Sequence, residues 1–200
     1  MAKTSVTIIA TGVANIASMR GAFHRLGCET VLTQEPARVL EDSLVVLPGV
    51  GAFGAGMERL RVLGLEGAIR ERVTSGRSLL AVCLGLQLLC RSSEESPGID
   101  GLSILDGIVE RFRTPERIPQ LGWNEVTAPP EARYLRSGYA YFANSFCARS
   151  ITGVDVIAPA TYGHQFVAAC ERGGLLACQF HPELSGAWGA SLLDRWIAGA

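Results

Sequence analysis

Cys83 occupies a position at which enzymes often place a nucleophile. Residues 81–85, A-V-C-L-G, join an apolar run predicted to be a strand at 77–82 to a predicted helix at 84–91. A side chain on such a tight strand-to-helix turn is exposed above the sheet, and the unpaired N–H groups at the start of a helix favour a thiolate. The alternative is an ordinary core cysteine, because free cysteine is among the most buried residue types.

His181 and Glu183 could supply a base and the group that orients it. They stand two positions apart in Q-F-H-P-E, at the end of a predicted strand at 175–179. A carboxylate at this spacing can fix one imidazole tautomer, as the third member of a catalytic triad does. A lone histidine is more often a hydrogen-bonded surface residue, so the pair forms a triad only if it meets Cys83 in space. His24 and His164 lack such a partner and are interpreted as surface residues.

A glycine-rich segment offers backbone donors for an oxyanion. Residues 48–54, P-G-V-G-A-F-G, contain three glycines and a proline, a composition that predicts a loop. Its N–H groups at Val50 and Gly51, together with the N–H of Leu84, could stabilise a tetrahedral intermediate, a device worth about 3 kcal/mol per donor. The alternative is a simple strand-to-helix turn. A phosphate loop is excluded, because its G-K-[ST] ending is missing.

The elements that must position these residues alternate between strand and helix in the first half of the chain. The patterns predict strands at 5–10, 30–32, 44–47 and 77–82, and helices at 14–26, 36–41, 57–73 (broken near Gly64) and 84–91. After Pro97 they predict strands at 107–112, 124–127, 139–146, 154–157, 165–170 and 175–179, then a closing helix at 189–197. Repeated β-α units require a parallel sheet covered on both faces. We therefore expect an α/β three-layer sandwich with a mixed, mostly parallel central sheet.

Composition favours one domain, residues 1–200, with 48% hydrophobic residues. A net charge of −1 without a basic cluster argues against nucleic acid or an anionic membrane as a partner.

The most apolar stretch, 78–90, is too short and interrupted to span a membrane, and no signal peptide is recognisable, so we expect a cytoplasmic protein. The six cysteines include no C-x-x-C pair. We expect no metal, no cofactor and no disulfide framework.

Five motifs resemble, in order and spacing, those of a known family. They are L-P-G-V-G-A-F (47–53), A-V-C-L-G-L-Q-L-L (81–89), P-Q-L-G-W-N (119–124), Y-F-A-N-S-F (141–146) and the segment 162–186, which contains Q-F-H-P-E-L-S-G. Over nearly its whole length the chain resembles the glutaminase subunit of imidazole glycerol phosphate synthase. The cysteine and histidine motifs are general to the class I glutamine amidotransferases, whereas P-Q-L-G-W-N and Y-F-x-N-S look particular to the histidine-pathway enzyme.

The resemblance implies that Cys83, His181 and Glu183 form a catalytic triad. Cys83 would attack the carboxamide of glutamine, His181 would protonate the departing ammonia, and Glu183 would hold His181. Water activated by His181 would then hydrolyse the γ-glutamyl thioester to glutamate.

The resemblance also implies how glutamine is held. The expected contacts are the backbone of Gly51, the side chains of Gln87 and Glu95, and the backbone near Ser145 and Phe146. A glutamine and a carboxylate suit an α-amino group. For Glu95 the alternative is solvation at the surface, because it lies in the polar run 92–96.

A partner is implied as well. The family docks on a cyclase with a (β/α)8 barrel as a heterodimer, so that ammonia is delivered without loss to bulk water. Together they would convert a phosphoribulosyl aminoimidazole carboxamide intermediate into imidazole glycerol phosphate and aminoimidazole carboxamide ribotide, in histidine biosynthesis. A peptide rotation in the loop 48–51 could complete the oxyanion hole only when the partner is loaded.

The chain departs from the family pattern at a few positions. Residues 10–15 read A-T-G-V-A-N where the family usually has D-Y-G-x-G-N, and Leu184 replaces a usual lysine. Both changes lie where the family meets its cyclase, so they bear on the interface and on allosteric coupling. Asn144 replaces a frequent histidine, and Ala81 a usual glycine.

Two other functions stay open at this point. The first is the glutaminase component of anthranilate or aminodeoxychorismate synthase, which usually carries histidine where this chain has Leu86. The second is a catalytically inactive subunit that only stabilises a partner. The intact Cys83, His181, Glu183 and Gly51 argue against inactivity.

Overall fold

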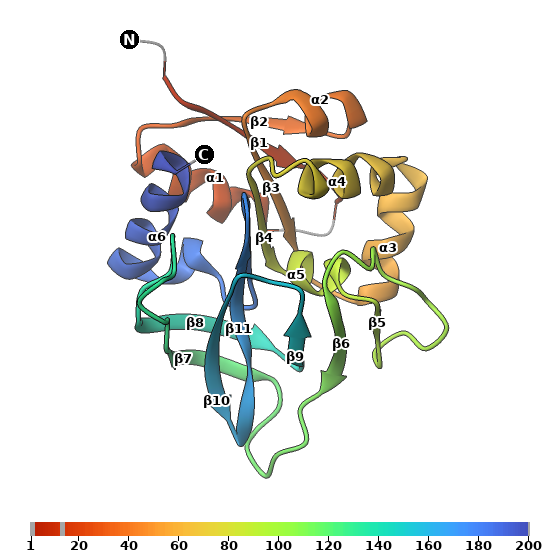
Figure 1. Ribbon diagram of the computed structural model, residues 1–200, viewed down its shortest axis with the longest axis vertical. Coiled ribbons are helices and arrows are strands. Elements are labelled where there is room, and N and C mark those ends of the chain that lie inside the picture. The colour runs from red at the N-terminus through yellow and green to blue at the C-terminus, as the bar shows by residue number, and fades with distance from the viewer. Residues whose placement is uncertain (1–2, 13–14, 200) are drawn as a thin grey trace.

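A seven-stranded mixed sheet forms the centre of the computed structural model, which describes residues 3–12 and 15–199 (Figure 1). Its strands, in spatial order, are β10 (Val156–Tyr162), β11 (His164–Arg172), β12 (Leu175–Cys178), β4 (Leu79–Cys83), β3 (Leu44–Gly49), β1 (Ser5–Ile9) and β2 (Glu29–Thr33). The five strands from β12 to β2 run parallel, and β11 and β10 continue one edge antiparallel. The predicted mixed, mostly parallel sheet is therefore confirmed.

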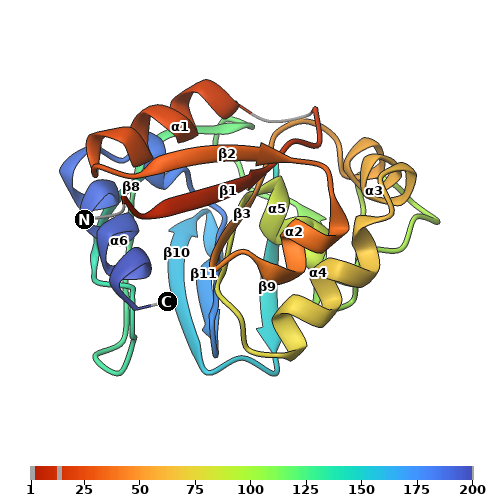
Figure 2. The same ribbon diagram turned by 90° about the horizontal axis from the view of Figure 1, so that it is seen from above.

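Helices cover both faces of this sheet. One face carries α1 (Ile16–Arg25) and α6 (Gly186–Ala198), and the other carries α2 (Pro36–Glu41), α3 (Phe53–Val62), α4 (Leu65–Thr74) and α5 (Leu84–Leu89). Figure 2 shows α1 and α6 on one side of the central strands and α3 and α4 on the other. The three-layer α/β sandwich expected from the sequence is confirmed. Among the described residues, none of the helices combines the length and apolar character needed to cross a bilayer.

The side chains of β3 are apolar on both faces of the sheet, which is why both faces are covered. Leu44 and Val46 point into the cluster under α1 and α6, whereas Val45 and Leu47 point into the cluster under α3, α4 and α5. All four are at most 4% exposed. Each such side chain gains about 1.5–3 kcal/mol from complete burial, so a run that is apolar at every position is stable only between two helical layers.

Two features of the helices follow from local sequence. Gly64 adopts φ +66°, a left-handed conformation that suits glycine. It divides the predicted long helix into α3 and α4. Helix α1 begins at Ile16, where the Asn15 side chain accepts a hydrogen bond from the N–H of Ser18 (3.3 Å). Val13 and Ala14, part of the 10–15 motif and of the predicted first helix, lie outside the described residues.

The prediction that 48–54 is a loop was wrong at both ends. Pro48 and Gly49 extend β3 and pair with β4, while β1 pairs with β3 only as far as Val46, so the proline lies beyond the doubly paired part of the strand. Helix α3 already begins at Phe53, because the carboxylate of Glu95 accepts the N–H of Phe53 at 2.7 Å. Both differences from the prediction arise from contacts with distant parts of the chain. Only residues 50–52 remain as loop.

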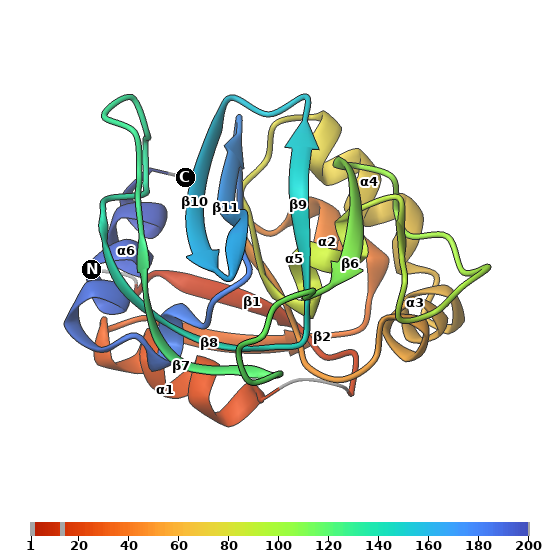
Figure 3. The ribbon, with the colours of Figure 1, turned by 90° about the horizontal axis from the view of Figure 1, so that it is seen from below.

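The predicted strand 139–146 is in fact two strands. β8 (Gly138–Asn144) pairs with β7 (Gln120–Val126), whereas β9 (Phe146–Thr152), which was not predicted, pairs with β6 (Asp106–Arg111). Ser145 is the junction between them. Figure 3 shows the β7–β8 ribbon crossing the molecule beside β9 and β6; the short β5 (Ser92–Ser93) completes the small sheet of β6 and β9.

Candidate active site

Cys83 ends β4 and directly precedes α5, on the sharp turn that the sequence predicted. Its backbone has φ 55° and ψ −109°, a conformation that side chains rarely adopt and that costs about 1–3 kcal/mol. Two glycines make the turn possible. A Cβ on Gly49 would lie 2.8 Å from the Cβ of Leu84, and a side chain on Gly85 would collide with the carbonyl of Leu47. The close approach of α5 to β3 thus fixes the strained conformation of the cysteine.

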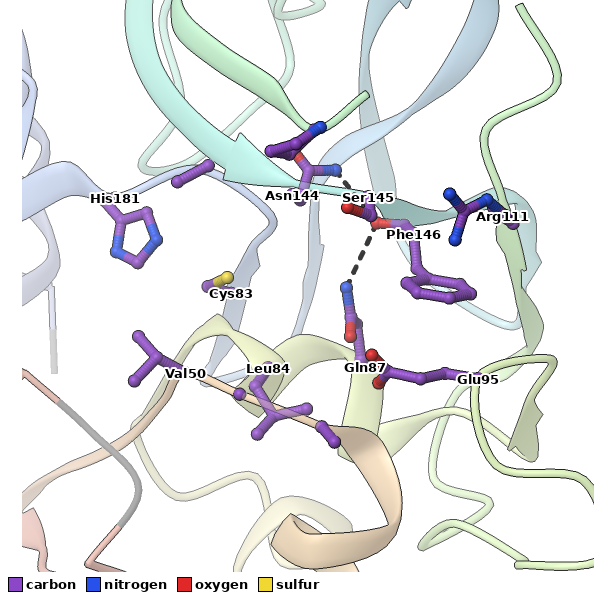
Figure 4. A pocket seen from close by; sticks show the side chains of 14 residues that line it. Val50, Cys83, Leu84, Gln87, Glu95, Arg111, Asn144, Ser145, Phe146 and His181 are labelled. Atoms are coloured by element: carbon purple, nitrogen blue, oxygen red, sulfur yellow. Dashed lines mark hydrogen bonds between the residues drawn. The ribbon is translucent and has the colours of Figure 1, made fainter. Parts of the chain in front are cut away.

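His181 and Glu183 form a buried hydrogen-bonded pair beside this turn. The Nδ1 of His181 lies 2.8 Å from Oε1 of Glu183, which belongs to the short 3-10 helix η1 (Pro182–Leu184). Figure 4 shows the imidazole facing the sulfur of Cys83. The parallel pairing of β12 with β4, which sets Cys178 opposite Val82, explains the convergence, because both segments leave the same edge of the sheet.

Opposing effects act on the His181 imidazole. Its burial alone would lower the pKa, but hydrogen bonding to Cys83 and Glu183 and their negative charges outweigh burial and raise the pKa to about 10. The imidazole therefore carries a proton at neutral pH. With Nδ1 held by the carboxylate, its Nε2 is left for the sulfur or for a reacting group.

A buried serine that sequence reasoning missed holds this histidine in place. The hydroxyl of Ser185 donates to the carbonyl of His181 (2.6 Å) and accepts the N–H of Tyr141 (2.9 Å), and the N–H of His181 bonds the carbonyl of Tyr141 (2.9 Å). These bonds tie η1 to β8. No local sequence signal could have found them, because they depend on a strand about 40 residues away.

One cavity of about 670 Å³ contains the sulfur of Cys83 and the imidazole of His181 (Figure 4). This volume is typical of small-ligand pockets. The other residues that line it are Val50, Gly51, Ala52, Leu84, Gln87, Glu95, Arg111, Pro119, Ala143, Asn144, Ser145 and Phe146. Every site residue predicted from the sequence lines this cavity except Glu183, which lies behind His181.

The residues expected to donate to an oxyanion flank Cys83. Val50 and Gly51 lie on the loop between β3 and α3, where Gly51 adopts φ +95°. Leu84 is the first residue of α5, so its N–H belongs to the helical turn that has no acceptor within the helix. Figure 4 shows Val50 and Leu84 on the same side of the cavity below the sulfur.

The opposite part of the cavity is polar. Gln87 donates through Nε2 to the carbonyl of Phe146 (3.2 Å), so its Oε1 remains as an acceptor. Glu95 is half-buried and holds the start of α3, which differs from the solvated position that its polar neighbours suggested. Arg111, which sequence reasoning missed, lies with its guanidinium 5.8 Å from the ring centre of Phe146.

The other five cysteines differ from Cys83 in their surroundings. All are buried and free, and burial raises the pKa of each thiol. The pKa reaches about 12 at Cys147 and Cys170. These five thiols therefore stay protonated at neutral pH, and the five side chains act as small apolar residues of the core.

Comparison with known proteins identifies the family and the fold. A family model for class-I glutamine amidotransferases matches residues 11–198. A crystal structure of a glutamine amidotransferase superimposes with a TM-score of 0.77 at 24% identity, covering 98% of this chain and all of that one. The structure of PurLQS from Thermotoga maritima gives 0.74 at 16% identity, with 99% of each chain covered. At these identities the two structures establish the fold.

Relatives in sequence identify the family more closely than the solved structures do. The imidazole glycerol phosphate synthase subunit HisH of Methanothermobacter thermautotrophicus is 35% identical over 96% of this chain and 97% of its own length. The same subunit of Symbiobacterium thermophilum is 37% identical, with 96% and 92% covered. The chloroplastic hisHF protein of Arabidopsis thaliana is 35% identical over 96% of this chain, which spans 34% of that protein. The chain therefore belongs to the class-I glutamine amidotransferases and, among them, to the HisH family of imidazole glycerol phosphate synthase subunits.

Proposed function

We propose that this chain hydrolyses glutamine to glutamate and ammonia through a triad of Cys83, His181 and Glu183. The observation that carries the proposal is the hydrogen-bonded His181–Glu183 pair facing a strained cysteine inside one cavity, in a member of the HisH family. Each member of the triad has a role that its contacts support.

The reaction proceeds in two halves. The Cys83 thiolate attacks the carboxamide carbon of glutamine, and the resulting oxyanion accepts N–H groups of the 50–51 loop and of Leu84. Protonated His181 gives its proton to the departing nitrogen, which leaves as ammonia while a γ-glutamyl thioester forms. Water then loses a proton to His181 and attacks the thioester. Glutamate departs, and the thiolate faces a protonated imidazole again.

The polar part of the cavity is proposed to hold the amino acid end of glutamine. The Oε1 of Gln87 and the carboxylate of Glu95 accept from the α-ammonium group, and the backbone at Gly51, Ser145 and Phe146 fixes the rest. Since Glu95 also holds the N–H of Phe53, substrate binding bears directly on the start of α3 and on the preceding loop.

A cyclase with a (β/α)8 barrel is the proposed partner, in a heterodimer that makes imidazole glycerol phosphate and aminoimidazole carboxamide ribotide. The outer face of the β7–β8 ribbon beside the cavity supports a docking role, because Leu121, Trp123 and Tyr139 are 67%, 58% and 59% exposed there. Exposed apolar side chains gathered on one face mark interaction surfaces. Leu184, on η1, is 40% exposed and offers an apolar contact where the family usually has a lysine.

Two further parts of the proposal concern organisation. We propose that residues 1–200 form one domain, since the central sheet contains both the first strand of the chain, β1, and the last, β12. A cytoplasmic location is supported by the six free cysteines, which an oxidising compartment would tend to pair. The proposed switch is the segment 48–51, of which residues 50 and 51 follow the end of β3. Rotation of a peptide there would align the oxyanion donors only when the loaded cyclase is bound.

Glutamate release tests the proposal. We would assay the chain alone, with a cyclase, and with the cyclase plus its ribonucleotide ligand, beside a Cys83→Ala variant. The expected result is activity stimulated by the ligand and lost in the variant. Stimulation by a chorismate-using partner would instead favour the anthranilate-type glutaminase, and absence of glutamate release under all conditions would favour an inactive subunit.

A further inference from the structure

Gln179 connects the nucleophile to the wall of the cavity. It follows β12 and is completely buried. Its Nε2 lies 3.7 Å from the sulfur of Cys83, and its Oε1 accepts from Nε2 of Gln87 at 3.0 Å. The same Nε2 of Gln87 donates to the carbonyl of Phe146 at 3.2 Å. Four groups from three parts of the chain thus form one continuous series of hydrogen bonds.

The chemistry of the last member fixes the direction of the whole series. A backbone carbonyl only accepts, so Gln87 must present its amide nitrogen to Phe146. That nitrogen also faces Gln179, which must then present its oxygen. The amide nitrogen of Gln179 is left for Cys83. The donor end of a neutral amide therefore meets the sulfur.

We propose that Gln179 is a positioning residue for the nucleophile: its N–H, oriented through Gln87 by the carbonyl of Phe146, donates to the Cys83 sulfur and stabilises the thiolate. The inference rests on the proposed function only in taking Cys83 as the nucleophile. It adds a second donor to the sulfur, beside the imidazole of His181. Because Gln87 and Phe146 also line the cavity, glutamine binding and sulfur reactivity share one hydrogen-bonded series.

Hydrogen bonds to an ion are stronger than those to a neutral group, so the thiolate gains more from this donor than the thiol does. Loss of the donor must therefore move the pH at which the sulfur becomes reactive, and an effect on packing alone would not. The other five thiols are buried and stay protonated at neutral pH, so alkylation below pH 9 reports on Cys83.

The test is the pH dependence of alkylation by iodoacetamide, measured without glutamine on the whole chain. Gln179→Met keeps the length of the side chain and removes the donor. Its alkylation midpoint is expected about one pH unit above that of the unaltered chain, with reaction about tenfold slower at pH values below both midpoints. Gln179→Glu, nearly the same shape with a carboxylate in place of the donor, should shift the midpoint further. Gln87→Met should shift it in the same direction and by less.

Gln120→Met is the matched control, since Gln120 is also a buried glutamine and its amide has no hydrogen-bond partner among the described residues. Its profile should coincide with that of the unaltered chain. Coincident profiles for Gln179→Met, Gln179→Glu and the unaltered chain would overturn the proposal. If Gln179→Met does not fold, the nearly isosteric Gln179→Glu decides. The assay needs no glutaminase activity, so its outcome is separable from that of the proposed function.

Discussion

Replacing Glu183 by glutamine should impair both the rate and the pH range of glutamine hydrolysis. The carboxylate accepts the Nδ1–H of His181 at 2.8 Å inside the fold, and its charge helps to hold the pKa of His181 at about 10. Glu183→Gln keeps the shape and removes the charge. The effect of burial is then opposed mainly by Cys83, so the pKa of His181 falls, and the imidazole loses its proton at a lower pH.

The magnitude follows from the bond that is weakened. A hydrogen bond to a charged group contributes about 1.5–3 kcal/mol, which corresponds to a loss of roughly 10- to 100-fold in kcat/KM if the bond is needed in the transition state. The sign of the pH effect is also fixed. Protonated His181 is required to release ammonia, so activity falls as the pH rises through its pKa, and this fall should occur at lower pH in Glu183→Gln.

The assay is glutamate release by the complete complex between pH 6 and pH 11, in the unaltered chain, Glu183→Gln and Glu183→Asp. The aspartate variant retains the charge and should keep more of the alkaline activity than Glu183→Gln does. A Glu183→Gln variant with activity within twofold of the unaltered chain, and with the same alkaline limb, would refute the role assigned to the carboxylate.

Four other expectations are independent of that assay. Gly85→Ala should lower the free energy of unfolding by about 3 kcal/mol in urea denaturation, because its methyl group meets the Leu47 carbonyl; an unchanged midpoint would contradict the close approach of α5 to β3. Gln120→Met should raise the free energy of unfolding by about 1 kcal/mol, since both polar atoms of the buried amide lack partners among the described residues, and a loss of similar size would show that the amide is bonded. Trp123→Ala should weaken binding to the cyclase at least tenfold in calorimetry, while glutamate release by the chain alone is retained; unaltered affinity would move the docking surface elsewhere. The raised pKa of His181 stabilises the fold fully below pH 6.5, and this contribution is lost as the pH rises through about 10, so His181→Gln should reduce the alkaline loss of stability in denaturation curves; equal slopes for both proteins would contradict the raised pKa.

The fold could be predicted where its causes are local. The apolar run in β3 needs two covering layers, and Gly64 interrupts a helical pattern with a left-handed residue, so both could be recognised from neighbouring residues. The start of α3 at Phe53 could not, because its cap is a carboxylate 42 positions away. The division of 139–146 at Ser145 depends on pairing with β7 and β6, which the alternation of side chains does not specify.

In the candidate site, too, only the residues marked by local sequence could be predicted. Cys83, His181 and Glu183 could be selected because each stands in a short motif with an evident chemical use. Gln179 is the first residue of Q-F-H-P-E, and alternation along the chain places it on the same side as His181, but its link to Cys83 depends on the register between β12 and β4. Arg111 lies on β6 and reaches the cavity only through the packing of β6 beside β9, so no motif marked it.

Trapping of the covalent intermediate tests the central claim most directly. The complex would be mixed with glutamine in the presence of the cyclase ligand, quenched in acid within the first turnovers, digested, and analysed by mass spectrometry. The proposed mechanism predicts a γ-glutamyl group on the peptide that contains Cys83, and none in Cys83→Ser. Glutamate release by Cys83→Ser at the unaltered rate, or an acyl group carried only by another cysteine, would contradict it.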